Sequence, residues 1–282
     1  CCGIVGVKPT YGKVSRYGVF PLGETLDHVG PMTRSVADAA AILRTIAGFD
    51  PKDPTTRRET VRDYMDTVYN GAGSLRIGVD ESYCTKGVDP VVRNAVLATV
   101  QVFKDLGAEI HEVDLSGIND ATPLWYAMCA SEAAAAHAET FPSRADDYGP
   151  TFRTFLEDGV KVSGAHYVKA HIARQSVRRL IEDVLQQVDI LLCPAMSTPP
   201  MAVKDFSPQA VLPADDVPAL LAFTGPMDFS GSPTVTLPCG FTDDGLPLGL
   251  QLVGRHGEEG TIMQAAHAYE QATEWHTKQP EV

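Results

Sequence analysis

Few residues of this 282-residue chain have the types and spacing that support hydrolytic chemistry. Such chemistry needs a nucleophile, a base beside it and hydrogen-bond donors for a developing oxyanion. The chain contains no G-x-S-x-G elbow, no H-E-x-x-H and no Walker glycine loop, and the stretch from Gly225 to Gly231 lacks a following lysine. The sequence therefore offers only isolated candidates for catalytic groups.

Three of these candidates lie near the start of the chain. Asp27 could orient His28 as a catalytic dyad, although a turn-stabilising histidine is the favoured interpretation. Cys1 could act as an N-terminal nucleophile, but an apolar strand follows it and any excised fragment could begin in this way. We expect Lys8 to be solvated or to brace a loop. We expect the other histidines to be solvated on helix or strand surfaces: His111, His137, His166, His171, His256, His267 and His276.

The elements that must position any site alternate between strands and helices. A buried strand is expected over 3–9, and a long loop rich in glycine and proline follows it. Ser35 and Asp38 form a capping box for a helix that Gly48 ends. Further along, the patterns predict a strand over 75–80, a helix from Asp89 to Gly107, a strand over 108–115, helices over 123–188, a strand over 189–194, a proline-rich segment over 196–218, a hairpin of 234–238 with 248–253, and a terminal helix.

This alternation predicts the α/β class. The β-α-β unit at 75–115 implies parallel strands with a right-handed crossover. We therefore expect a mixed, largely parallel β-sheet that helices cover on both faces.

The composition excludes several classes of function. The formal net charge is −13, and no cluster of Lys and Arg suggests a nucleic-acid partner. No apolar stretch approaches the roughly 18 residues of a membrane span, so we expect a cytoplasmic protein without membrane contact. The six cysteines show neither metal-ligand spacing nor a disulfide framework, so we expect no metal and mostly buried thiols.

Two long stretches resemble the amidase signature family. They are residues 2–21 (CGIVGVKPTYGKVSRYGVFP) continued by 26–38 (LDHVGPMTRSVAD), and residues 189–194 (DILLCP) continued by 231–254 (GSPTVTLPCGFTDDGLPLGLQLVG). In that family the glycine- and serine-rich segment with the nucleophile lies a few residues ahead of the equivalent of Cys2. The resemblance thus implies that 1–282 are the C-terminal part of a single amidase domain.

The resemblance also implies a mechanism. One serine attacks the amide carbonyl, a second serine in a cis peptide relays the proton, and a neutral lysine is the final base. All three would lie upstream, so we assign no catalytic residue to this chain, and the mechanism needs no cofactor. Ser15, Ser35 and Lys8 occupy other parts of the family pattern.

The residues of this chain would instead shape the substrate pocket. The resemblance places Trp125 and Tyr126 at positions where aromatic side chains of related enzymes approach a small amide substrate. A second pocket segment supplies Phe223, Thr224 and Phe229. The alternative for the aromatic pair Trp125 and Tyr126 is core packing. Position 228, more often Asn in the family, is Asp here, which puts the usual hydrogen-bonding role of that side chain in doubt.

Three functions follow from the resemblance. The leading one is hydrolysis of a carboxamide or aryl amide with release of ammonia or an amine. The second is the A subunit of a glutamine-dependent tRNA amidotransferase. Those proteins have an acid just before the second pocket segment, whereas residues 219–222 (ALLA, around Leu221) contain no carboxylate, which leaves Arg178 as a surface cation. The third is a non-catalytic fragment. A homodimer is compatible with the sequence, and we expect poor solubility of this chain alone because apolar faces would lack their cover.

Overall fold

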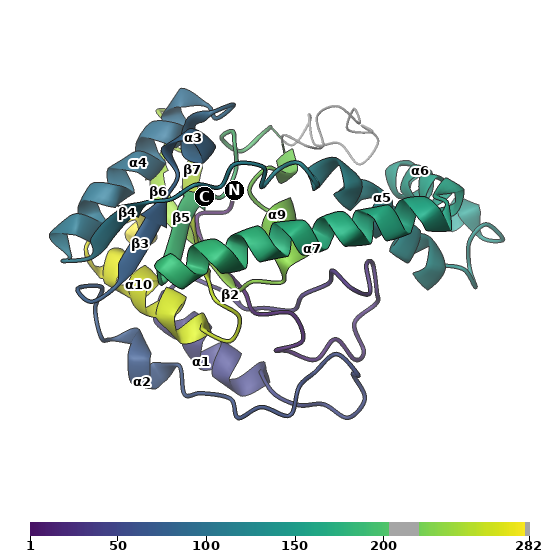
Figure 1. Ribbon diagram of the computed structural model, residues 1–282, viewed down its shortest axis with the longest axis horizontal. Coiled ribbons are helices and arrows are strands. Elements are labelled where there is room, and N and C mark those ends of the chain that lie inside the picture. The colour runs from purple at the N-terminus through teal and green to yellow at the C-terminus, as the bar shows by residue number, and fades with distance from the viewer. Residues whose placement is uncertain (203–219, 280–282) are drawn as a thin grey trace.

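The computed structural model describes residues 1–202 and 220–279 (Figure 1). Most of the proline-rich segment expected over 196–218 therefore lies outside the described residues. The described strands form one continuous sheet in the order β2-β1-β6-β7-β5-β3-β4. Their bounds are Val5–Lys8 (β1), Met32–Thr33 (β2), Arg76–Val79 (β3), Glu109–Glu112 (β4), Ile190–Pro194 (β5), Thr234–Phe241 (β6) and Pro247–Gly254 (β7).

The sheet is mixed, as expected, but it is not largely parallel. Only the pairs β3·β4 and β3·β5 are parallel, whereas β1·β2, β1·β6, β5·β7 and β6·β7 are antiparallel. The predicted β-α-β unit and the predicted hairpin are both confirmed. The expectation was wrong because β1 joins β6 across more than 200 residues, and no local pattern announces such a pairing.

The helices of the described residues are α1 to α7, α9 and α10, with two short 3₁₀ segments. The α-helical bounds are Val36–Ile46 (α1), Met65–Val68 (α2), Glu81–Thr85 (α3), Pro90–Asp105 (α4), Thr122–Ala136 (α5), Pro150–Lys161 (α6), Gly164–Gln187 (α7), Gly225–Ser230 (α9) and Glu259–Gln271 (α10); η1 is Ala145–Asp147 and η2 is Trp275–Thr277. Ser35 caps α1 through the Asp38 N–H, and Asp89 caps α4 with Pro90 following, as the sequence predicts.

Helices lie on both faces of the sheet. The Gln251 side chain of β7 donates to the Phe223 carbonyl over 2.8 Å, so its face of the sheet meets the segment that leads into α9. Gly254, three positions later, faces the other way, where a Cβ atom would lie 2.7 Å from Ile262 of α10. α4 packs on the same side as α10, and the long α7 crosses in front of the sheet and contacts α9 (Figure 1).

An ion-pair cluster fixes one end of the central strands. Asp189, directly before β5, accepts hydrogen bonds from the Arg76 N–H at 3.0 Å and its guanidinium at 2.8 Å, and from Arg255 at 3.0 Å. These hydrogen bonds, Arg76 first, hold the pKa of the Asp189 carboxyl well below its usual range. β3, β5 and the end of β7 are thereby tied together in register.

Candidate functional site

The polar groups that could serve an active site gather around α9. This short helix starts with Pro226 in its first turn and ends at Gly231, whose φ of 70° is the left-handed conformation that favours glycine. A Cβ atom at Gly231 would also lie 3.1 Å from the Cβ of Tyr11. The N-terminal loop and α9 are thus held close together.

Asp228 on α9 connects three segments that are distant in sequence. One carboxylate oxygen accepts a hydrogen bond from the Trp125 indole of α5 over 2.7 Å, and the other lies 3.3 Å from Nδ1 of His28. The same Nδ1 is 2.6 Å from the Leu26 carbonyl, so the proton is assigned to Nδ1. Asp228 therefore keeps a hydrogen-bonding role in this chain although the family position is more often Asn.

His28 does not pair with Asp27, which corrects the dyad considered from the sequence. The Asp27 carboxylate accepts from the Leu22 and Gly23 N–H groups, and so it shapes the turn. The His28 side chain is only 5% exposed, and burial, followed by the charge of Lys8, lowers its pKa. His28 is therefore a neutral imidazole that braces the loop against α9.

Lys8 is neither solvated nor remote from this cluster. Its ammonium group leaves the end of β1 and donates to the Ser232 carbonyl. Burial lowers the pKa of Lys8 to about 8, and attraction from Asp228 and Glu259 limits the fall. The loop-bracing interpretation of Lys8 is thus correct, and the solvated one is wrong. His137, at 7% exposure, is likewise buried rather than solvated.

Arg174 of α7 is a site residue that the sequence analysis missed. Its guanidinium donates to the Phe229 carbonyl and to the hydroxyl and carbonyl of Thr25, each over 2.8 Å. Glu132 of α5 completes the group by accepting from Thr25 and from the Tyr167 hydroxyl. The available signal was helical spacing, because Arg174 lies four residues after the buried Ala170.

The residues predicted to bind substrate fall in different environments. Trp125 reaches α9, whereas Tyr126 points to α6, with its hydroxyl 3.2 Å from Asp158. Phe223 and Phe229 are 2% and 1% exposed, so their rings belong to the core. Thr224 is exposed at the start of α9. The structure therefore brings Trp125 and the α9 segment together and separates Tyr126 from them, and the substrate-binding roles remain predictions.

The remaining candidates have structural explanations. Arg178 lies on the surface of α7, where its Nε donates to Glu182 over 2.8 Å, as expected for a surface cation. Four cysteines are buried and two, Cys1 and Cys2, are exposed. Burial raises the pKa of Cys129 to about 12, and the thiols of Cys193 and Cys239 behave in the same way. These buried thiols are poor nucleophiles.

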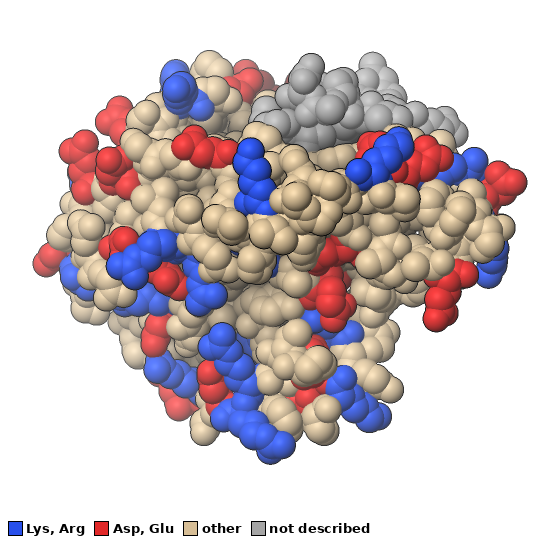
Figure 2. Space-filling view, turned by 45° about the vertical axis from the view of Figure 1, so that its right-hand side comes forward, with Lys and Arg blue, Asp and Glu red and all other residues tan. Residues whose placement is uncertain are grey.

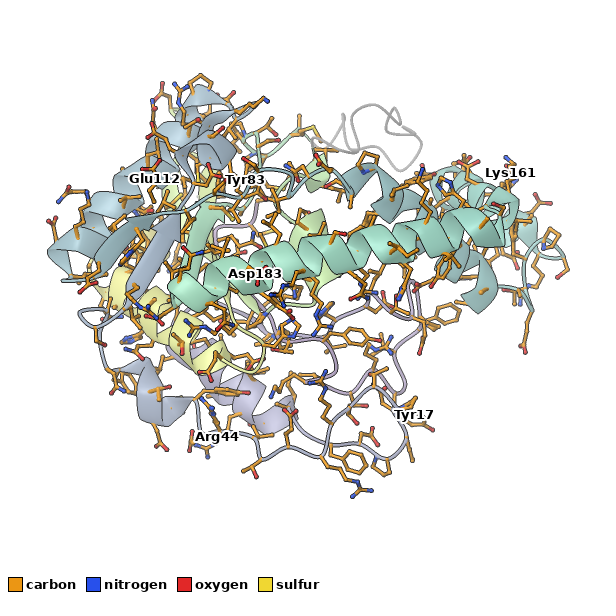
Figure 3. The ribbon with its side chains drawn as sticks, viewed as in Figure 1. Tyr17, Arg44, Tyr83, Glu112, Lys161 and Asp183 are labelled. Atoms are coloured by element: carbon orange, nitrogen blue, oxygen red, sulfur yellow. The ribbon has the colours of Figure 1, made fainter. Side chains whose placement is uncertain are left out.

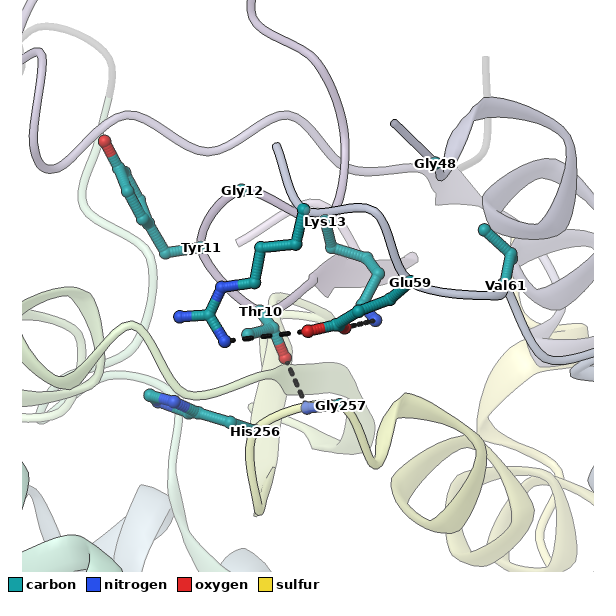
Figure 4. A pocket seen from close by; sticks show the side chains of 10 residues that line it. Thr10, Tyr11, Gly12, Lys13, Gly48, Glu59, Val61, His256 and Gly257 are labelled. Carbon is teal, nitrogen blue, oxygen red and sulfur yellow. Dashed lines mark hydrogen bonds and ion pairs between the residues drawn. The ribbon is translucent and has the colours of Figure 1, made fainter. Parts of the chain in front are cut away.

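A small polar cavity of about 70 Å³ lies between the N-terminal loop and the start of α10 (Figure 4). Glu59 is shared there by Lys13 at 3.5 Å and Arg57 at 3.7 Å, and the Thr10 hydroxyl accepts from the Gly257 N–H. The charged side chains that line this cavity already pair with one another. They therefore hold the surrounding segments together and provide no free nucleophile or base.

The structure describes residues 1–202 and 220–279. Within these ranges no group of three or more His, Cys, Asp or Glu side chains is arranged to hold a metal ion. No described helix has the length and apolarity to cross a membrane. On the face shown in Figure 2, basic and acidic side chains are interspersed.

Solved structures share this fold. The A subunit of the Thermotoga maritima glutamyl-tRNA(Gln) amidotransferase superposes with a TM-score of 0.81 at 27% identity, over 96% of this chain and 58% of that chain. A bacterial aryl acylamidase of the amidase signature family gives 0.82 at 23% identity, over 98% and 60%. A 6-aminohexanoate cyclic dimer hydrolase gives 0.86 at 24%, over 99% and 62%. The last two likenesses concern the fold alone.

Sequence comparison defines the family. The amidase family model matches residues 1–263, and the chain therefore belongs to the amidase signature family. The A subunits of the glutamyl-tRNA(Gln) amidotransferases of Chloroflexus aurantiacus and Halalkalibacterium halodurans are 37% and 36% identical over 99% of the chain. The chain spans 61% of the length of each of these relatives.

Proposed function

We propose that the chain forms the substrate-binding part of an amide hydrolase that acts on a carboxamide or an aryl amide. Membership of the amidase family supports the reaction class. In the proposed enzyme, the two serines and the lysine that the family resemblance implies precede Cys1, and α9 with Trp125 borders the acyl group of the substrate.

One observation carries the choice of substrate class. Asp228 is the only carboxylate in residues 220–231, and its two oxygens already face Trp125 and His28. The segment thus has no unengaged carboxylate to bind a substrate amine, while Trp125 offers an aromatic surface beside it. An uncharged, ring-bearing acyl group suits these surroundings better than an amino acid does.

A second candidate is the A subunit of a glutamine-dependent tRNA amidotransferase. The identity of 35–37% to proteins of that name favours it. Residues 219–222, where the resemblance implies an acid near Leu221, contain no carboxylate, and this weighs against it. A non-catalytic role for the chain is the third candidate. It predicts no turnover by this chain alone, as the first candidate also does, so the longer protein is needed to separate the two.

The test uses the longer protein that carries the upstream segment. We expect it to hydrolyse benzamide and acetanilide with a higher kcat/KM than L-glutamine, and Trp125→Ala to lower kcat/KM for the aryl amides about tenfold or more. Tyr126→Ala, on the next position of α5 but facing α6, is the matched control. Turnover of glutamine alone, dependent on partner proteins that copurify, would favour the second candidate, and inertness toward the whole panel would remove the proposal.

A further inference from the structure

A second region with the features of a ligand site lies at the carboxyl ends of β3, β4 and β5. The three strands are parallel and lie in the order β5-β3-β4. The chain passes from β3 to its neighbour β4 and then returns to form β5 on the opposite side of β3. In open α/β sheets, ligands bind in the crevice outside the carboxyl ends of the strands at such a reversal of strand order. Tyr83 and Glu112 mark this end of the sheet in Figure 3.

A hollow of about 590 Å³ occupies this position. It begins at Asp80, directly after β3, and extends to the loop after β4 and to Ser197 beyond β5. A volume of this order is typical of small-molecule sites. The fold therefore places an open hollow where the topology predicts a ligand.

The charged groups around the hollow are not all engaged. Asp80 is buried, and its carboxylate accepts hydrogen bonds from the N–H groups of Tyr83 at 2.9 Å and Leu115 at 2.7 Å, so it serves the fold. Lys86 and Asp120 line the same hollow and are exposed, and neither side chain forms a hydrogen bond or ion pair with another described residue. One cation and one anion thus remain available to a ligand.

The rest of the lining is partly apolar. The Tyr83 ring lies 4.8 Å from that of Phe223, and its hydroxyl donates to the Ala222 carbonyl, so the ring is fixed. Pro123, in the first turn of α5, is exposed on the same hollow. A rigid aromatic wall next to two opposite charges is complementary to a molecule with an apolar body and both charges.

We propose that this hollow binds a small zwitterion of the amino-acid type. Its carboxylate pairs with Lys86, its ammonium group pairs with Asp120, and its apolar side chain lies on Tyr83 and Pro123. This binding involves no bond cleavage and does not depend on the amide hydrolysis proposed above.

The test is saturation-transfer NMR with three probes on the longer protein that carries the upstream segment, because we expect the 282-residue chain alone to be poorly soluble. L-phenylalanine carries both charges, 3-phenylpropanoate lacks the ammonium group, and 2-phenylethylamine lacks the carboxylate. We expect L-phenylalanine to bind about fivefold more tightly than either analogue, the upper range of the contribution of one exposed ion pair. Lys86→Met should remove the preference over 2-phenylethylamine, and Asp120→Asn the preference over 3-phenylpropanoate.

Exposed residues elsewhere provide matched controls. Lys104→Met on α4 and Asp244→Asn in the β6–β7 turn make the same chemical changes away from the hollow and should leave all three affinities unchanged. Circular dichroism checks that each variant folds. Failure of L-phenylalanine to bind the parent protein, or equal binding by parent and both variants of the hollow, would overturn the proposal. Neither outcome bears on amide turnover by the longer protein.

Discussion

At the scale of single residues, the site depends on partners that lie far apart in the chain. The sequence placed Asp27 beside His28, yet the structure pairs His28 with Asp228, 200 positions away. Lys8 and Arg174 are similar cases, since each meets its carbonyl partner only in the folded protein. Residue types revealed which groups could form bonds, and only tertiary structure decided which bonds formed.

Asp228 should contribute to stability through its two hydrogen-bonding oxygens. Asp228→Leu leaves the Trp125 indole without an acceptor and removes the carboxylate that faces the buried His28, so we expect a loss of about 2–3 kcal/mol in the free energy of unfolding. Asp228→Asn keeps one carbonyl oxygen for Trp125 and should lose less than half of that. Urea unfolding at pH 7 measures both, and equal stability of the two variants would show that the hydrogen bond to Trp125 contributes nothing.

Lys8 should make stability depend on pH in the alkaline range. Its pKa is about 8 in the folded protein and 10.5 in the unfolded reference, so between these values the unfolded chain binds more protons. Stability therefore rises with pH across this window, and below pH 8 the buried charge opposes folding in full. Lys8→Met lacks this titration. Because Lys8 is only partly buried, we expect the unfolding free energy of the parent chain to rise by roughly 2 kcal/mol relative to that of Lys8→Met from pH 8 to 10.

Urea unfolding at several pH values gives this difference directly, because groups common to both proteins cancel. Lys104→Met, on the exposed side of α4, controls for the removal of a lysine from the chain. A difference for Lys8→Met that stays constant from pH 8 to 10 would contradict the assignment of a lowered pKa to Lys8.

At the scale of elements, local signals predicted much of the fold. The capped starts of α1 and α4, the β-α-β unit and the β6–β7 hairpin all follow from local patterns, the longest of which is the β-α-β unit from Arg76 to Glu112. The parallel character of the sheet was overestimated because the β1·β6 and β5·β7 pairings join strands whose sequences give no sign of direction. The local hydrophobic pattern predicts that a strand exists, whereas its neighbour and direction are decided by contacts with distant parts of the chain.

The contact between α5 and α6 depends on the absence of a side chain. A Cβ atom at Gly159 of α6 would lie 2.0 Å from the Ala130 carbonyl oxygen of α5, which no side chain tolerates without movement. We expect Gly159→Ala to destabilise the protein by about 1–3 kcal/mol, although alanine favours helix formation. Gly164→Ala at the start of α7 meets no atom within 4 Å and should stabilise by about 0.4–1 kcal/mol. Thermal unfolding compares them, and the same sign for both would refute the close-contact argument.

At the scale of the whole molecule, the chain exposes apolar side chains in spaced pairs. Ile42 and Ile46 lie one turn apart on α1, and Val168 and Ile172, 56% and 63% exposed, lie one turn apart on α7. Met32 on the edge strand β2 is 77% exposed. Such surfaces are typical of faces that pack against further protein. The relatives, of which this chain spans 61%, contain additional chain that could supply this cover.

We therefore expect the 282-residue chain alone to self-associate without a fixed stoichiometry at micromolar concentration, since several unrelated apolar surfaces compete for partners. Replacing both Val168 and Ile172 with Glu should lower the weight-average mass measured by sedimentation velocity, because a charge on each residue disfavours burial. His171→Glu adds a charge between the same positions without removing an apolar side chain, and should have a smaller effect. A monodisperse monomer of the parent chain would show that these faces need no cover, and a discrete dimer would instead favour one specific homodimer interface.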